Sequence, residues 1–238
     1  MSTLNFLYKR KYAINDYISV EIPTVGEIID DEDSYYNLVS ILTSSPYDFM
    51  VQLDDANIDF TSINDYELFL LLFEQLKKKD THLVFGDLDL SRFVFDENSQ
   101  NGQVFLKDKS TGAKIDRAIY TQIVNVLRKI HHLEKNRRKP ANEEAKQYLL
   151  ERARKKMKRK NKRAEESELE SLIIAMVNTE QYKYDFEGTR ELSIYQFNES
   201  VRQIIKKVDY DNRMYGIYTG TINPKELSPD DLNWLIHK

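Results

Sequence analysis

The sequence predicts a mainly α protein with a small β element: an α+β fold with a helical core, a short N-terminal strand and a β-hairpin near residues 92–107. Six consecutive apolar residues, Leu68–Phe73, cover every face of a helix, which predicts a central helix buried on all sides. Apolar residues also recur at helical spacing over residues 116–134. The dipeptide Asn101-Gly102 separates two segments rich in β-forming residues and predicts the hairpin turn.

The composition is that of a globular protein on the charged side. The 238 residues, 41% hydrophobic and 31% charged, are enough to bury a core. The sequence contains no Cys, which excludes disulfides, thiolate catalysis and Cys-ligated metal sites. Near the N-terminus, Lys and Arg follow a short apolar patch, the reverse of a signal peptide, and no apolar run is long enough for a membrane span. We therefore expect no association with a membrane.

The first fifty residues predict one strand and three helices. The alternation in Tyr17–Ile22 predicts a short strand that stops before a proline. Thr24 and Glu27 have the spacing of a capping box and predict a short helix over residues 25–29. A helix is expected over Ser34–Thr43, and Ser45, followed by proline, is the expected N-cap of another.

The central helix is expected to run to about Lys79, where three lysines suit the negative end of the helix dipole. Its predicted burial implies that Leu71→Asp unfolds the protein, because an unpaired charge in a core is strongly destabilising. The segment His82–Phe85, rich in β-forming residues, predicts a short strand between this helix and the hairpin.

The last third of the chain predicts a compact helical segment. Glu165–Thr179 and Ser193–Lys207 have apolar residues at helical spacing and predict two amphipathic helices. Met214–Gly220, rich in Gly and Tyr, predicts an irregular connection. Ser228, followed by Pro and two Asp residues, predicts a capped terminal turn.

The charge is distributed unevenly and predicts three segments. Residues 1–134 form an acidic α+β domain, residues 135–164 a basic linker or helical arm, and residues 165–238 a C-terminal helical segment. The net charge of the chain is −4, yet residues 135–163 contain 14 Lys or Arg and 3 Glu, while residues 1–100 have a net charge of −12. This polarity favours self-association into a homo-oligomer, or a basic arm that meets an acidic partner.

Enzyme signatures are missing from the sequence. Asp54–Asp59 lacks the Gly and the distal Glu of an EF-hand loop, and helix-end or loop acids explain it better. His131 and His132 are adjacent, so on a helix they point about 100° apart and do not form a metal pair. No phosphate-binding glycine loop or nucleophile motif occurs. We expect no enzyme activity and no catalytic, cofactor-binding or metal-binding residues.

The basic tract is the most distinctive feature of the sequence, and it has three interpretations. It could neutralise nucleic-acid phosphates, although it lacks the interleaved aromatic residues that stack on bases. It could be a solvated helix that balances the acidic first half, or it could dock onto an acidic protein. The candidate contact residues are Arg152, Arg154, Lys155, Lys156, Lys158, Arg159, Lys160, Lys162 and Arg163.

Several phrases spread over the chain resemble a virion-assembly, tail-module protein family of Gram-positive tailed bacteriophages and prophages. These phrases are Ile22–Ile28 (IPTVGEI), Ser45–Asp55 (SPYDFMVQLDD), Asp65–Phe69 (DYELF), Val84–Leu90 (VFGDLDL), Ile174–Asn178 (IAMVN) and Asp231–Trp234 (DLNW). They are packing and capping phrases, so the resemblance implies a role in virion assembly without a catalytic mechanism.

The resemblance implies a protein made with the tail module, such as a tail assembly chaperone that binds the tape-measure protein in the host cytoplasm. Such a helper needs apolar grooves and a charged exterior. The candidate groove residues are Tyr35, Phe49, Phe69, Phe73 and Trp234, for which core packing is the competing interpretation. The alternatives are a structural component of the virion, in the baseplate, neck or tail, and a nucleic-acid-binding protein that uses residues 152–163.

Overall fold

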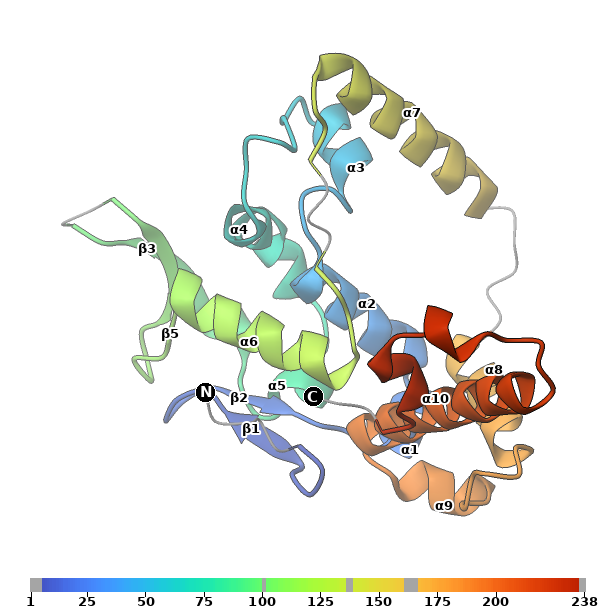
Figure 1. The fold of residues 1–238 in the computed structure, drawn as a ribbon. Coiled ribbons are helices and arrows are strands. Elements are labelled where there is room, and N and C mark those ends of the chain that lie inside the picture. Colours follow the sequence, from blue (N-terminus) through green and yellow to red (C-terminus); the bar gives the residue numbers. More distant parts are fainter. Residues whose placement is uncertain (1–5, 100–101, 136–138, 161–166, 236–238) are drawn as a thin grey trace.

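The computed structural model describes residues 6–99, 102–135, 139–160 and 167–235 (Figure 1). The structure is mainly helical with two small antiparallel sheets, which confirms the predicted α+β class. In chain order the elements are β1 (Lys11–Ala13), β2 (Ser19–Glu21), α1 (Val25–Ile29), α2 (Glu32–Thr43), α3 (Met50–Asp55), α4 (Asp65–Leu76), α5 (His82–Phe85), η1 (Leu90–Arg92), β3 (Phe93–Glu97), β4 (Val104–Asp108), β5 (Lys114–Ile115), α6 (Arg117–Ile130), α7 (Glu143–Lys160), α8 (Glu168–Val177), α9 (Phe186–Glu191), α10 (Ile194–Tyr218), η2 (Pro224–Glu226) and η3 (Pro229–Leu232).

The N-terminal strand and the capped helix after it form as predicted. β2 lies within the predicted strand and pairs antiparallel with β1, which the sequence analysis missed. In the capping box before α1, the Glu27 N–H donates to Thr24 Oγ1 at 3.1 Å, and the Thr24 N–H donates to Glu27 Oε2 at 2.6 Å. These bonds satisfy backbone donors that the first turn of a helix leaves free.

The central helix α4 lies between two apolar clusters. Phe69 and Phe73 belong to the main core, whereas Leu68 belongs to a smaller cluster on another side of the helix. Two clusters explain why the apolar run is wider than one helix face requires. However, the Leu71 side chain is 51% exposed, so the prediction that this helix is buried on all sides is wrong, and Leu71→Asp loses the burial on which its expected effect depended.

Two local predictions are wrong for reasons of turn chemistry. His82–Phe85 is the short helix α5, because the Asp80 carboxylate accepts from the His82 N–H and starts a turn. Ser45 does not begin a helix: its N–H and its hydroxyl both donate to the Asp48 carboxylate at 2.8 Å, and α3 begins at Met50. In both cases a side-chain carboxylate near the turn decides the backbone path.

The predicted hairpin is confirmed and gains a third strand. β3 pairs with β4 through the register Phe95↔Leu106, and β5 pairs with the other edge of β4. Asn101 of the expected turn lies outside the described residues. The Tyr66 hydroxyl donates to the Val104 and Ile115 carbonyl oxygens, which attaches this sheet to α4. α6 has Asp116 as its N-cap and lies within residues 116–134, where the apolar spacing predicted a helix.

The C-terminal helix α10 is much longer than predicted. It continues to Tyr218, so most of the expected connection Met214–Gly220 is helical. The returning chain passes close to Gly216: a Cβ on this residue would lie 2.6 Å from Ile222 Cδ1, so any larger residue would displace that side chain. The glycine was interpreted as a turn signal, whereas its role is to allow a close approach of the returning chain.

The main core combines residues from both ends of the chain. The Phe6 and Tyr195 rings meet edge to face with centroids 5.4 Å apart. The Val25 N–H donates to the Leu192 carbonyl oxygen, and the Ile194 N–H donates to the Pro23 carbonyl oxygen. The division of the chain into three segments stays a prediction, but the first and the last segment share this core.

Candidate functional site

Helix α7 contains the described part of the basic tract and packs on α3 through one face (Figure 1). Lys146, Leu150, Arg154 and Met157 recur at intervals of four, four and three residues, so they share that face. Leu150 is 3% exposed and completes the small apolar cluster with Leu53, Phe60 and Leu68. The helix is therefore held in place by a narrow apolar contact.

Ion pairs flank this contact on both sides. Arg154 Nη2 donates to Asp54 Oδ2 at 2.7 Å and to Asp55 Oδ1 at 2.6 Å, at the C-terminal end of α3. Lys146 Nζ donates to Asp59 Oδ2 at 3.0 Å. Hydrogen bonds from Thr61, with a further bond from Lys146, lower the pKa of Asp59 to about 2. Asp54, Asp55 and Asp59, which resemble an incomplete cation-binding loop in the sequence, thus form ion pairs with the basic helix α7.

The opposite face of α7 is basic and exposed to solvent. Tyr148, Arg152 and Lys155 recur at intervals of four and three residues, and Lys156 lies beside them. All four are exposed, as is Lys158. We call Tyr148, Arg152, Lys155 and Lys156 the outer face of α7.

The structure therefore divides the nine candidate contact residues into different groups. Arg154 turns inward to the α3 acids, while Arg152, Lys155, Lys156 and Lys158 point to solvent. The tract is helical through Lys160, and the side chains of residues 159–160 are not described. Lys162 and Arg163 lie outside the described residues.

The five candidate groove residues do not line one groove. Tyr35, Phe69 and Phe73 are between 0% and 3% exposed and lie in the main core. Phe49 is partly buried against the smaller cluster, and Trp234 is 45% exposed in the C-terminal segment. The prediction that these five residues form one groove is therefore wrong. Tyr35, Phe69 and Phe73 lie at the helical spacing that buried core residues also have.

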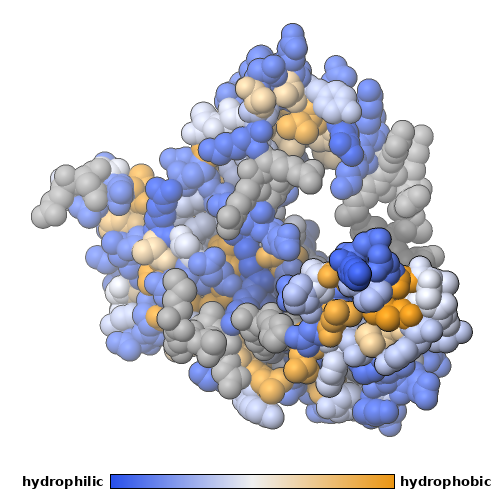
Figure 2. Space-filling view, viewed as in Figure 1, coloured by the Kyte–Doolittle hydropathy of each residue, from blue (hydrophilic) through white to orange (hydrophobic). Residues whose placement is uncertain are grey.

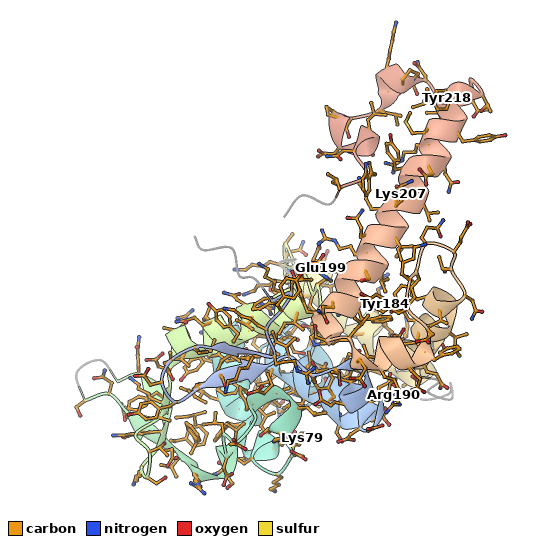
Figure 3. All side chains as sticks on the ribbon, turned by 90° about the horizontal axis from the view of Figure 1, so that it is seen from below. Lys79, Tyr184, Arg190, Glu199, Lys207 and Tyr218 are labelled. Atoms are coloured by element: carbon orange, nitrogen blue, oxygen red, sulfur yellow. The ribbon has the colours of Figure 1, made fainter. Side chains whose placement is uncertain are left out.

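A more exposed apolar region lies on residues 203–235, which we call the C-terminal arm. Here α10 leaves the body and the chain folds back along it (Figure 3). The Gln203 side chain donates to the Trp234 carbonyl oxygen at 2.7 Å, Lys206 donates to the Asp230 carbonyl oxygen at 2.9 Å, and Arg213 pairs with Asp231 at 2.7 Å.

The C-terminal arm exposes large apolar and aromatic side chains. Tyr218 is 81% exposed and Tyr215 is 72% exposed. Hydrophobic surface is visible over α10 and the chain that follows it (Figure 2). The other exposed members are Ile205, Val208, Leu232, Trp234 and Leu235. Grouped apolar exposure of this kind marks surfaces that contact other molecules.

A cavity of about 400 Å³ lies beside α2, the C-terminal end of α6 and the start of α10. Two of the polar side chains that line it are engaged with their neighbours: Arg128 Nη2 donates to the Thr43 carbonyl oxygen, and the His131 ring hydrogen-bonds the Tyr35 hydroxyl at 2.8 Å. Burial, together with the neighbouring His132, lowers the pKa of His131 to about 4. These groups hold α2 against α6.

The described part of the chain contains neither a cluster of metal-binding side chains nor a helix suited to a membrane. Within residues 6–99, 102–135, 139–160 and 167–235, no group of three or more His, Asp or Glu side chains could hold a metal ion. Over the same residues, no helix combines the length and the apolar character that a membrane crossing requires. The two surfaces that stand out are therefore the outer face of α7 and the C-terminal arm.

Residues 158–237 match the family model described as the YomV second domain, a phage-derived protein family. The match covers the C-terminal third of the chain and includes the C-terminal arm, and it suggests a phage-associated protein. No curated protein and no solved structure matches the chain.

Proposed function

We propose that this chain is a phage morphogenesis protein that acts through protein–protein contacts rather than catalysis, and that it assists tail assembly as a chaperone-like factor in the host cytoplasm. The observation that carries the proposal is the exposed apolar surface of the C-terminal arm, which lies within the segment that matches a phage-derived family. Seven large apolar or aromatic side chains there are at least 37% exposed. An assembly factor needs such a surface to engage other chains.

The partner that fits this role is a long helical protein, such as the tape-measure protein, whose apolar faces are open before the tail polymerises. A helix with an apolar stripe can bury that stripe against the exposed residues of the arm. A structural place in the virion is the alternative, because the same surface could also form permanent contacts.

Quantitative mass spectrometry of purified particles, beside the lysate of the cells that produce them, tests the proposal. An assembly factor is abundant in the lysate and absent from finished particles. Many copies per particle would instead identify a structural component and end the chaperone proposal. A double variant, Tyr215→Ser with Tyr218→Ser, tests the arm itself: we expect fewer complete tails at an unchanged protein level. The matched control is Tyr8→Ser with Tyr17→Ser, since both of these tyrosines are also exposed.

A second candidate function is nucleic-acid binding, which the outer face of α7 favours. Arg152, Lys155 and Lys156 share one exposed side of the helix, where they can reach successive phosphates of a DNA backbone. The inward pairing of Arg154 leaves this side free of the α3 acids.

Salt-dependent binding of a labelled DNA duplex tests this candidate. Changing Arg152, Lys155 and Lys156 to Gln is expected to lower the slope of log affinity against log salt by about 3, roughly one unit per lost phosphate contact. The control changes Lys78, Lys79 and Lys109 to Gln, which removes the same charge from other exposed sites. An equal loss of DNA affinity in both variants would show that binding depends on the general charge of the chain and not on the outer face of α7.

A further inference from the structure

One side of the projecting part of α10 carries an exposed stripe with the spacing of a coiled-coil seam. The stripe consists of Ile205, Val208, Asn212 and Tyr215, at intervals of three, four and three residues. Ile205 is 62% exposed, Val208 37% and Tyr215 72%, and Asn212 is also exposed. Val201, four residues earlier, continues the stripe to the body, where it packs against the main core. Alternating intervals of three and four residues are those of a heptad repeat.

The rest of the C-terminal arm leaves this stripe uncovered. The chain that folds back after α10 contacts the helix through Gln203, Lys206 and Arg213, and at the end of the helix through Gly216. At about 100° per residue, Gln203, Lys206 and Arg213 lie between about 100° and 180° around α10 from Val208 and Asn212, whereas Gly216 lies about 40° from Asn212 and bounds the stripe at its far end. The helix is thus packed on one side by its own chain and open on the other (Figure 3).

We propose that α10 pairs with α10 of a second copy of this chain, as a parallel, in-register coiled coil that makes the protein a homodimer. With Ile205 at the first heptad position, Asn212 takes the same position one heptad later. An Asn at this position is tolerated in a two-stranded parallel seam because it meets its own counterpart, and the two amides hydrogen-bond each other. A single polar residue in an apolar stripe therefore points to a second copy as the occupant.

The charges beside the stripe select the parallel orientation. Asp209 and Asp211 flank the seam on its two sides. In a parallel pair, Asp209 faces Ile204 of the partner subunit, and Asp211 faces Gly216 of the partner subunit, so no like charges meet. In an antiparallel pair with full overlap, each of these carboxylates would face its own counterpart. Like charges directly opposite are destabilising, although Arg213 and Lys207 partly neutralise them.

The seam spans only two heptads, so the dimer is expected to be weak and to dissociate on dilution through the micromolar range. Figure 3 shows α10 standing out from the body, which leaves its stripe accessible. Two bodies would then lie at the same end of the paired helices. This association concerns the purified chain alone, so it can succeed or fail independently of a role in tail assembly.

Sedimentation velocity of the full chain over a concentration series tests the proposal. Ile205→Glu is expected to raise the dissociation constant at least about tenfold, because each copy would place a charge in the seam. Ile174→Glu is the matched control, since this isoleucine is 49% exposed on α8, away from the stripe. Thermal melting of each variant establishes that it remains folded. A monomer at every concentration, or equal effects of the two changes, would overturn the proposal.

Cysteine cross-linking tests the orientation of the two helices. Because the native sequence contains no Cys, only the introduced thiol can react. In a parallel pair, Asn212→Cys brings two thiols together in the seam, and mild oxidation should give a disulfide-linked dimer. Ile174→Cys should remain monomeric under the same conditions. A dimer that persists in sedimentation while Asn212→Cys fails to cross-link would show that the helices are not parallel and in register.

Discussion

Individual positions in this chain show that an apolar residue in an apolar run need not be buried. Within the six-residue run of α4, Phe73 is fully buried and contacts Phe69 and Phe95, whereas Leu71 is 51% exposed. The two residues are only two positions apart, which on a helix separates them by about 200°. The sequence pattern identified the helix correctly, but it could not show which positions of the helix are buried and which are exposed.

We expect Leu71→Asp to leave the melting temperature nearly unchanged, while Phe73→Ala lowers the free energy of unfolding by about 3–5 kcal/mol. The reason is that truncation of Phe73 leaves a cavity in a packed core, whereas Leu71 already meets solvent. Thermal and urea denaturation, followed by circular dichroism, measure both variants. A large loss of stability in Leu71→Asp would mean that this side chain is covered in solution, for example by a partner.

At the scale of elements, the basic helix α7 is held by a small contact that depends on charge. Leu150 supplies the apolar part, and Arg154 and Lys146 pair with acids of the α3 region. The same helix presents other basic residues to solvent, so one sequence tract has a structural side and a free side. Helical periodicity of the charges alone could have suggested the two sides, but only the position of α3 shows which one is paired.

Two arginines on α7 provide a matched test of this division. Arg154→Ala removes the pairs to Asp54 and Asp55, so amide hydrogen exchange should become faster in both α7 and α3. Arg152→Ala is the same change two residues earlier on the outer face, and we expect exchange in α3 to stay as in the wild type. High salt should reproduce the effect of Arg154→Ala, because exposed pairs are screened. Equal protection in both variants would contradict the assignment of the inner face.

At the scale of the whole molecule, the two ends of the chain complete one core. Phe6, Val25 and Tyr195 belong to the same apolar cluster although they are far apart in sequence. In Figure 1, α9 lies against α1, and α10 also contacts α6, so the last segment packs on the first. The composition shift that predicted three segments describes charge, and it does not reveal how the apolar residues combine.

Truncated chains test whether the first segment needs the last segment to complete its apolar core. A chain ending at residue 134 is expected to lose cooperative unfolding and to bind a hydrophobic dye, because it exposes the surface that Ile194, Tyr195 and Phe197 cover. A chain ending at residue 206 removes most of the C-terminal arm and serves as the control, since the main-core residues remain present. A cooperative melt for residues 1–134 would show that the first segment is an independent domain.

The sequence by itself determined the α+β class, the hairpin, the capped start of α1, and the amphipathic helices α6 and α8, because these depend on nearby residues. Local side-chain chemistry and periodicity are sufficient for such features. Two features depended on residues more distant in sequence, and only the tertiary structure decided them. One is the shared core between the two ends of the chain, and the other is the inward pairing of Arg154.

The candidate surfaces show the same limit. The basic tract could be found from composition, but the stripe on α10 was missed, since a helix that seemed to end at Lys207 could not include Asn212 and Tyr215. Gly216 suggested an irregular connection, but it lies within α10 and contacts Ile222. That contact forms only where the chain folds back in the tertiary structure. Whether an apolar face is core or surface depends on what else packs there, and sequence spacing does not contain that information.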